Sequence, residues 1–203
     1  AEAAASATML AIDIETPRTL TLVPQPPTKT GKERKPKRIK GDRRITCVGF
    51  AHEPWFSLTV PTTLEYWRDE LSLRQAWGYI RALCALPTPK VFQNGLFDTY
   101  WLADAGIDVA AWPWDTRWMH HCLDPTDTHS LAYMASVDTR QPFWKDMKDS
   151  KDGDDDDDAF DTSAFDTFSR YNGIDAAVTR ELAPVYRCRL EAAQRLPFYE
   201  RHY

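Results

Sequence analysis

The order of apolar and polar residues along the chain predicts several strands of one sheet. Residues 9–15 alternate between apolar side chains and polar or small ones, which is the period-two pattern of a strand. Two short apolar runs, 45–51 and 55–60, lie close together and predict a β-hairpin that continues this sheet. A further apolar run, 90–93, predicts a buried strand.

Helical spacing of apolar residues predicts helices between and after these strands. The first takes Ser72 as its N-cap and stops before Pro87. The second follows the turn at Asn94–Gly95 and ends near Gly106. Three more helices are expected at 116–123, 130–137 and 164–194, the last bent at Pro184. This order of elements predicts an α/β domain with a mixed sheet.

The composition suits a single globular domain that carries long insertions. Of 203 residues, 43% are hydrophobic, which is enough for one sizeable core. No apolar run approaches the ~20 residues that span a bilayer, so a membrane protein is not expected. The apolar stretch 1–11 has no basic region and leads into the first strand, which argues against a signal peptide. The four cysteines form no CxxC pair, which argues against a zinc site or disulfide framework and for a reducing compartment.

The net charge of −5 conceals two segments of opposite sign. Residues 29–44 hold nine basic side chains and two acidic ones, within a proline-rich insertion over 17–44 that is expected to be a long flexible excursion. Residues 146–158 hold eight aspartates and two lysines, within an acidic loop over 145–161 that is expected to be solvated. The basic insertion is equally consistent with an arm that contacts nucleic-acid phosphates and with a solvated loop.

Two acidic residues end the first predicted strand. Side chains two positions apart on a strand project to the same face, about 6.5 to 7 Å apart, so the carboxylates of Asp13 and Glu15 can converge on one divalent ion. A pair of this kind is also typical of a solvent-facing polar stripe. The apolar residues before it favour an interior strand instead, where two acids need a counter-charge.

Other candidate groups follow later in the chain. Asp98 stands at the start of a helix beside a buried strand, where ligand groups gather in α/β sheets, although an acid there also complements the helix dipole. Tyr171 and Asp175 are four residues apart on the last helix and therefore share one face. Taken alone, such a pair is equally typical of a helix surface.

Together these residues resemble the three motifs of the DEDD (DnaQ-like) 3′-to-5′ exonuclease superfamily, in its tyrosine-containing subgroup. The motifs are Asp13-x-Glu15, Asn94-x-x-Phe97-Asp98 and Tyr171-x-x-x-Asp175, accompanied by Asp115-Thr116, His129-Ser130-Leu131 and Asn172. The whole set is most similar to the proofreading domains of bacterial and phage family A DNA polymerases. This resemblance implies an RNase H-like fold, with a five-stranded mixed sheet flanked by helices.

The resemblance also implies two divalent metal ions, Mg²⁺ or Mn²⁺, bound by four acids. Asp13 would bridge both ions, Glu15 and Asp175 would complete the site that binds the attacking water, and Asp98 would hold the second ion largely through waters. Tyr171 would orient that water. Two ions can supply an activated water and neutralise the charge of phosphodiester hydrolysis. A phenol with an ordinary pKa near 10 suits positioning of the water better than proton abstraction.

The resemblance therefore implies a metal-dependent exonuclease domain over 1–203, expected to be monomeric, that releases 5′-mononucleotides from single-stranded DNA 3′ ends. It is expected to be the proofreading domain of a longer polymerase, in the cytosol of a bacterium or a phage-infected host. The alternatives are an RNase D-like exoribonuclease and an inert nuclease-fold module that binds nucleic acid. The expected substrate contacts are Thr16, Asn94, Phe97, Lys35, Lys37 and Arg38. His120 and His121 are adjacent on a helix and diverge by about 100°, which favours packing over metal binding.

Overall fold

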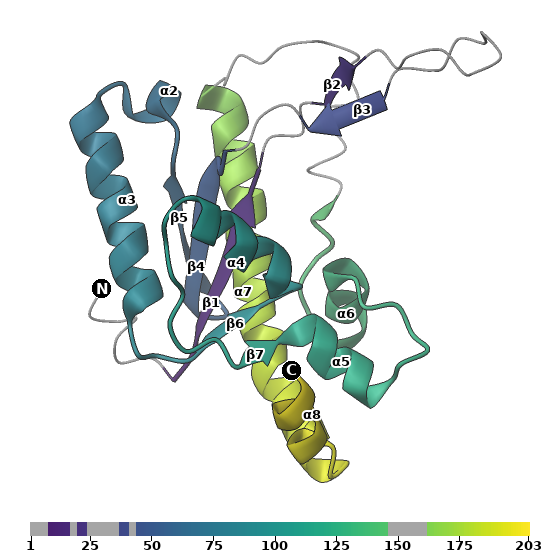
Figure 1. Cartoon of the computed structure of the whole chain (residues 1–203). Coiled ribbons are helices and arrows are strands. Elements are labelled where there is room, and N and C mark those ends of the chain that lie inside the picture. The colour runs from purple at the N-terminus through teal and green to yellow at the C-terminus, as the bar shows by residue number, and fades with distance from the viewer. Residues whose placement is uncertain (1–7, 17–19, 24–36, 41–43, 146–161) are drawn as a thin grey trace, which may run out of the picture.

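A five-stranded mixed sheet forms the centre of the computed structural model, which describes residues 8–16, 20–23, 37–40, 44–145 and 162–203 (Figure 1). The sheet order is β5-β4-β1-β6-β7. The strands are β1 (Leu10–Glu15), β4 (Cys47–Glu53), β5 (Phe56–Pro61), β6 (Lys90–Phe92) and β7 (Trp114–Asp115). β1 pairs antiparallel with β4 and parallel with β6, and β5 and β7 extend these two sides antiparallel and parallel respectively. The predicted mixed sheet is confirmed.

Helices cover both faces of the sheet. They are α2 (Leu64–Trp67), α3 (Glu70–Ala85), α4 (Gly95–Asp104), α5 (Thr116–Leu123), α6 (Leu131–Asp138), α7 (Thr162–Ala192) and α8 (Leu196–His202). In Figure 1, α3 and α4 lie on one side of the sheet, and the long α7 crosses the other side. No helix in the described part of the chain is long and apolar enough to cross a membrane.

The alternation along β1 decides which side chains meet each layer. Leu10, Ile12 and Ile14 pack into the core beneath α3 and α4. Ala11, in between, belongs to the core beneath α7. Because side chains alternate along a strand, Asp13 and Glu15 lie on the α7 face together with Ala11. The strand that separates the two cores therefore presents both of its acids to one helix.

The structure corrects three details of the sequence prediction. The insertion over 17–44, which was expected to be a long flexible excursion, contains two strands that the pattern did not predict: β2 (Leu20–Val23) pairs antiparallel with β3 (Lys37–Lys40). The first long helix starts earlier than predicted, because Asp69 rather than Ser72 is its N-cap and accepts a 2.8 Å hydrogen bond from the Ser72 amide. The short elements α2, β7 and α8 were not predicted from the pattern, because two to seven residues carry too little periodicity.

Candidate active site

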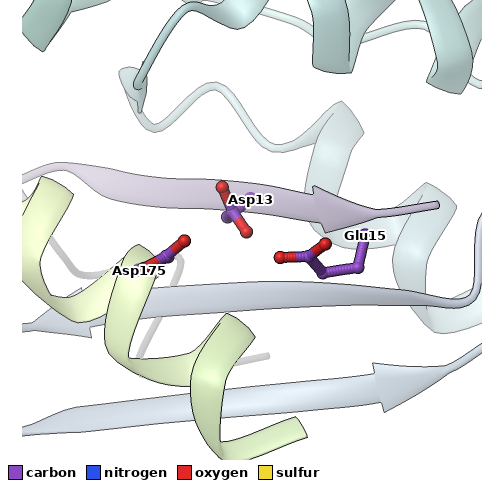
Figure 2. A group of neighbouring side chains, drawn as sticks. All are labelled: Asp13, Glu15 and Asp175. Carbon is purple, nitrogen blue, oxygen red and sulfur yellow. The ribbon is translucent and has the colours of Figure 1, made fainter. Parts of the chain in front are cut away.

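Three carboxylates from two distant segments converge on the α7 face of β1. Asp13 and Glu15 come from β1 and Asp175 comes from α7, and one oxygen of each lies within 4.8 Å of the others (Figure 2). Glu15 and Asp175 are buried, and Asp13 is partly exposed. The arrangement has the size and the oxygen donors that a hard divalent ion requires.

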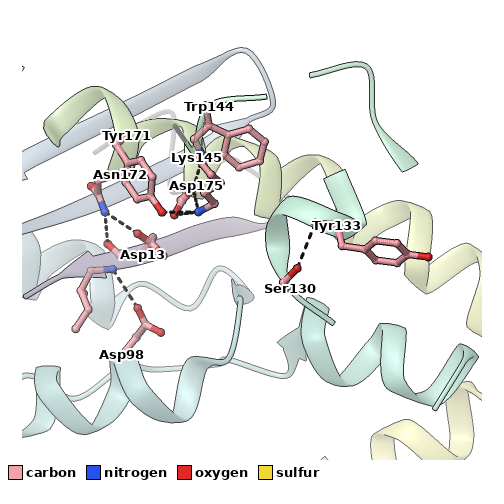
Figure 3. A network of polar contacts seen from close by, with 10 residues as sticks. Asp13, Asp98, Ser130, Tyr133, Trp144, Lys145, Tyr171, Asn172 and Asp175 are labelled. Carbon is pink, nitrogen blue, oxygen red and sulfur yellow. Dashed lines mark hydrogen bonds and ion pairs between the residues drawn. The ribbon is translucent and has the colours of Figure 1, made fainter. Parts of the chain in front are cut away.

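Asp98 approaches the same strand from the first turn of α4. It is buried, and its Oδ1 accepts a 3.0 Å hydrogen bond from the backbone amide of Ile14 (Figure 3). The carboxylate thus ties α4 to β1 between the two acids of the strand. Asp98 lies beside the three converging carboxylates of Asp13, Glu15 and Asp175. Among the described residues, it does not belong to the group whose oxygens lie within 4.8 Å of one another.

Burial and mutual repulsion make these acids hard to ionise together. The pKa of Asp13 is raised well above its ordinary value, first by burial and then by the charges of Asp175, Asp98 and Glu15. Burial likewise raises the pKa of Asp98, against the opposing effect of the hydrogen bond from Ile14. A bound cation would favour the charged form of each carboxylate. The described residues therefore fit a divalent metal ion both in donor type and in charge.

Tyr171 adds a phenol to the site from one helical turn before Asp175. The side chain is buried, and its pKa is raised above the ordinary value by burial and then by the neighbouring carboxylates, Asp175 foremost. The phenol therefore stays protonated throughout the physiological range. It can position a water molecule through a hydrogen bond, and it cannot act as a base at neutral pH.

Asn172 is a site residue whose role the sequence did not reveal. Its Nδ2 donates to the carboxylate of Asp13 (2.7 Å) and to the backbone carbonyl of the same residue (3.2 Å). It is fully buried, and its Oδ1 lies 3.2 Å from the hydroxyl of Thr59 on β5. Asn172 thus links α7 to β1 and holds Asp13 in place. The only sequence signal was its position beside Tyr171 in the family-like motif.

Trp144 and Lys145 also enter the site, and nothing in the sequence indicated this. The indole of Trp144 donates to Asp175 Oδ1 at 2.6 Å, and the ammonium of Lys145 lies 2.7 Å from both oxygens of Asp175 (Figure 3). The expected solvated loop over 145–161 was therefore wrong at its first residue, because Lys145 pairs with a buried acid. Residues 146–161 lie outside the described part of the chain.

The predicted substrate contacts have different positions. Thr16 is buried directly after Glu15, and Phe97 is 41% exposed on α4, next to Asp98. Asn94 precedes α4 with a left-handed backbone conformation (φ 64°), and its Oδ1 accepts a 3.2 Å hydrogen bond from Arg117. Lys35 lies outside the described residues, and only the backbone of Lys37 and Arg38 is described, in β3. All six residues therefore remain predictions as substrate contacts.

The two adjacent histidines of α5 are joined by a third. Nδ1 of His129 lies 2.8 Å from Nδ1 of His120, and Nε2 of His129 lies 3.0 Å from Nδ1 of His121. Each ring nitrogen of His129 therefore contacts a different histidine. Because an imidazole can bind a given metal ion through only one of its nitrogens, these two contacts do not form a single metal site. The three rings form a hydrogen-bonded network that links α5 to the start of α6.

Asp115 holds the start of α4, and therefore the segment that carries Asp98. The carboxylate accepts hydrogen bonds from the backbone amides of Asn94 (3.1 Å) and Gly95 (2.7 Å). It also accepts one from the backbone amide of Arg117 (2.9 Å) on α5. One buried side chain thus caps two helices at the end of the sheet.

We expect Asp115→Ala to lower the free energy of unfolding by about 1 to 3 kcal/mol, because it leaves buried amides of two helices without acceptors. Urea denaturation followed by circular dichroism measures this loss. Asp124→Ala is the matched control, since Asp124 is an exposed acid that caps only its own turn through Thr126. Equal stability of the two variants would contradict the role given to Asp115.

Comparison with known proteins agrees with this geometry. A family model described as 3′-5′ exonuclease matches residues 55–185, a range that contains Asp98, Tyr171 and Asp175. Asp13 and Glu15 precede the matched range, and the fold brings them to Asp175. No curated protein sequence matches the chain significantly.

Several solved structures share the fold at low sequence identity. The POL domain of Pol1 from M. smegmatis, in complex with DNA primer-template and dNTP, has a TM-score of 0.59 at 10% identity, covering 98% of this chain and 27% of that one. Escherichia coli RNase D, an exoribonuclease involved in structured RNA processing, has 0.60 at 14%, covering 98% and 44%. Brucella melitensis NrnC with bound Mg²⁺ has 0.57 at 18%, covering 97% and 80%. The chain thus spans about a quarter of the polymerase structure, and these similarities identify the RNase H-like fold alone.

Proposed function

Because the chain belongs to the 3′-5′ exonuclease family, we propose that it removes nucleotides one at a time from the 3′ ends of single-stranded DNA, with divalent metal ions as cofactors. The observation that carries this proposal is the convergence of Asp13, Glu15 and Asp175 within 4.8 Å. Family membership accounts for the direction of the reaction, and the oxygen-only donor set supports Mg²⁺ or Mn²⁺.

In such a site, each of the described residues would have a different role. Divalent ions held by the three converging acids, with Asp98 beside them, would supply an activated water and neutralise the charge that develops on the phosphate; we propose two ions. Asn172 fixes the carboxylate of Asp13 through its 2.7 Å hydrogen bond, so this ligand is oriented before any ion binds. The neutral phenol of Tyr171 would orient the attacking water.

Tyr171→Phe is expected to lower kcat by about 10- to 100-fold while leaving the affinity for Mn²⁺ within the same order of magnitude. The substitution removes only the hydroxyl that orients water, and the carboxylates stay. Single-turnover digestion of an end-labelled oligonucleotide measures the rate, and Mn²⁺ binding is measured on the same protein. Wild-type activity of this variant would remove Tyr171 from the mechanism.

The proposal also specifies DNA, rather than RNA, as the substrate. It is supported by the resemblance of the motifs to polymerase proofreading domains and by the structural similarity to Pol1 from M. smegmatis. The second candidate is an exoribonuclease, which the similar TM-score of Escherichia coli RNase D favours. A proofreading role beside a polymerase domain of the same parent chain would follow from the first candidate.

One experiment tests direction, metal dependence and sugar preference together. Single-stranded DNA and RNA of identical sequence and length, each labelled at the 5′ end, are incubated with the protein and Mg²⁺, Mn²⁺ or chelator. We expect a ladder that shortens from the 3′ end of DNA, that disappears with chelator, and that forms more slowly on RNA. Faster digestion of RNA would support the exoribonuclease, and digestion of neither substrate would support the inert binding module.

A further inference from the structure

A lysine side chain reaches into the acidic cluster and pairs with one of its members. The ammonium of Lys145 donates to both oxygens of Asp175 at 2.7 Å and to the hydroxyl of Tyr171 at 2.7 Å. It also lies 4.4 Å from the centre of the Tyr171 ring. Figure 3 shows the end of the lysine beside the Tyr171 hydroxyl and the carboxylate of Asp175. The site thus already contains one positive charge of its own.

The segment that delivers this lysine is itself anchored to α7. Trp144 is buried, and its indole donates to Asp175 at 2.6 Å. Three residues earlier, Gln141 donates to Glu181 at 3.0 Å, six residues beyond Asp175 on α7. Lys145 is therefore held against Asp175 by its neighbours, and only 22% of its side chain is exposed.

The ammonium uses the atoms that a metal ion would need. Both oxygens of Asp175 accept hydrogen bonds from Lys145. A Mg²⁺ ion bound to Asp175 would need one of these oxygens about 2.0 to 2.1 Å from the ion. An ammonium and a divalent ion bound to the same oxygens would lie within a few ångströms and repel each other strongly in a buried site. A metal ion that binds Asp175 therefore competes with Lys145 for these oxygens.

We propose that Lys145 is the internal counter-cation of Asp175 while no metal is bound, and that it is replaced at Asp175 when a divalent ion binds. The inference rests on the proposed function in one respect, namely that a divalent ion binds the acidic cluster. Because the ion and the lysine compete for the same oxygens, part of the binding free energy of the ion is used to displace the ammonium.

The first test measures the affinity of the protein for Mn²⁺, using the electron paramagnetic resonance signal of the free ion. We expect Lys145→Met to bind Mn²⁺ about 10-fold more tightly than the wild type, since the competing cation is gone and the aliphatic stem is retained. Arg201→Met is the matched control for the loss of one positive charge, because Arg201 is exposed on α8, which follows the C-terminal end of α7 (Figure 1). Its affinity should equal that of the wild type.

The outcomes separate this inference from the function on which it rests. If wild type and Lys145→Met bind Mn²⁺ equally well, or if the variant binds it more weakly, the lysine does not compete and the inference is wrong, while metal-dependent catalysis stands. If the wild type binds no Mn²⁺ at all, both proposals are overturned.

A second measurement uses the wild-type protein and does not depend on how the variant folds. Amine acylation followed by mass spectrometry of the peptide containing Lys145 reports how free this ammonium is. We expect the labelling rate of Lys145 to rise when Mg²⁺ is added, because the displaced side chain becomes accessible. Lys90, which is buried on β6, is the internal reference and should not respond. An unchanged or lower rate at Lys145 would overturn the inference.

Discussion

Asp13→Asn is expected to reduce exonuclease activity by at least about 100- to 1,000-fold, because it removes one negative charge from the centre of the acidic cluster, where we propose that divalent ions bind. The amide keeps the shape of the carboxylate and can still accept the hydrogen bond from Asn172. Loss of activity would therefore reflect lost charge and not a displaced side chain. Initial rates on end-labelled single-stranded DNA, at saturating Mg²⁺, measure the effect, and a rate close to that of the wild type would overturn the assignment of Asp13.

The same variant should be more stable than the wild type when no metal is bound. The pKa of Asp13 in the folded protein is raised above its ordinary value by burial and by the nearby acids. A carboxyl group with a raised folded pKa costs no stability below its ordinary pKa, and the cost grows as the pH rises from the ordinary value to the folded value and is constant above it. In chelator, Asp13→Asn should thus melt at the same temperature as the wild type below about pH 4, the ordinary range of an aspartate, and at a higher temperature at pH 8.

Thermal melts between pH 4 and 8 check this expectation, and Mg²⁺ supplies the control. Added Mg²⁺ should stabilise the wild type and narrow the gap at pH 8, since an ion that binds only the folded state raises its stability. A stability advantage of the variant that is largest at low pH would have the wrong sign and would contradict the argument.

Gly49→Ala is expected to lower the free energy of unfolding by about 1 to 3 kcal/mol and the activity by about 10-fold or more. Gly49 lies on β4 directly opposite Asp13, and a Cβ at this position would overlap Oδ1 of Asn172 and lie 3.0 Å from its Cγ. Asn172 is fully buried and held by Asp13 and Thr59, so it has little room to move. The variant should displace the amide that orients Asp13. Denaturant unfolding and steady-state rates measure the two effects.

Gly173→Ala is the matched control for this prediction. Its Cβ would also meet a polar atom, the hydroxyl of Ser57 at 2.7 Å, but that hydroxyl ends a short side chain that can rotate away. In addition, alanine favours the helix that Gly173 occupies, by up to about 1 kcal/mol. We expect this variant to retain most of its activity. Similar losses in both variants would show that crowding near α7, and not the position of Asn172, causes the effect.

Much of the local structure could be predicted because its signals are local. The alternation over residues 9–15 predicted both the strand and the shared face of Asp13 and Glu15. Helix α5 has the predicted bounds Thr116–Leu123, since the apolar spacing and the breaker that follows it lie within a few residues of each other. Period and caps act over one or two turns, so a single sequence contains them.

The convergence of Asp175 with β1 was implied by the resemblance and not by the pattern itself. Two carboxylates separated by about 160 residues meet only because α7 packs across the face of β1 that carries Ala11. The sequence alone determined which residues have the chemistry of a metal site, and the order of strands and helices that could hold them. It also determined, through period two, that β1 would present its acids on one side.

Only the tertiary structure decided which further groups complete the site. Asn172, Trp144 and Lys145 have no periodicity or spacing that relates them to Asp13, and the acidic residues after Lys145 suggested solvent instead. Their roles arise from contacts between segments far apart in the chain, in which a buried carboxylate accepts whichever donors the packing brings near. Such contacts depend on how whole elements are placed against each other, which is information that no local pattern of residues contains.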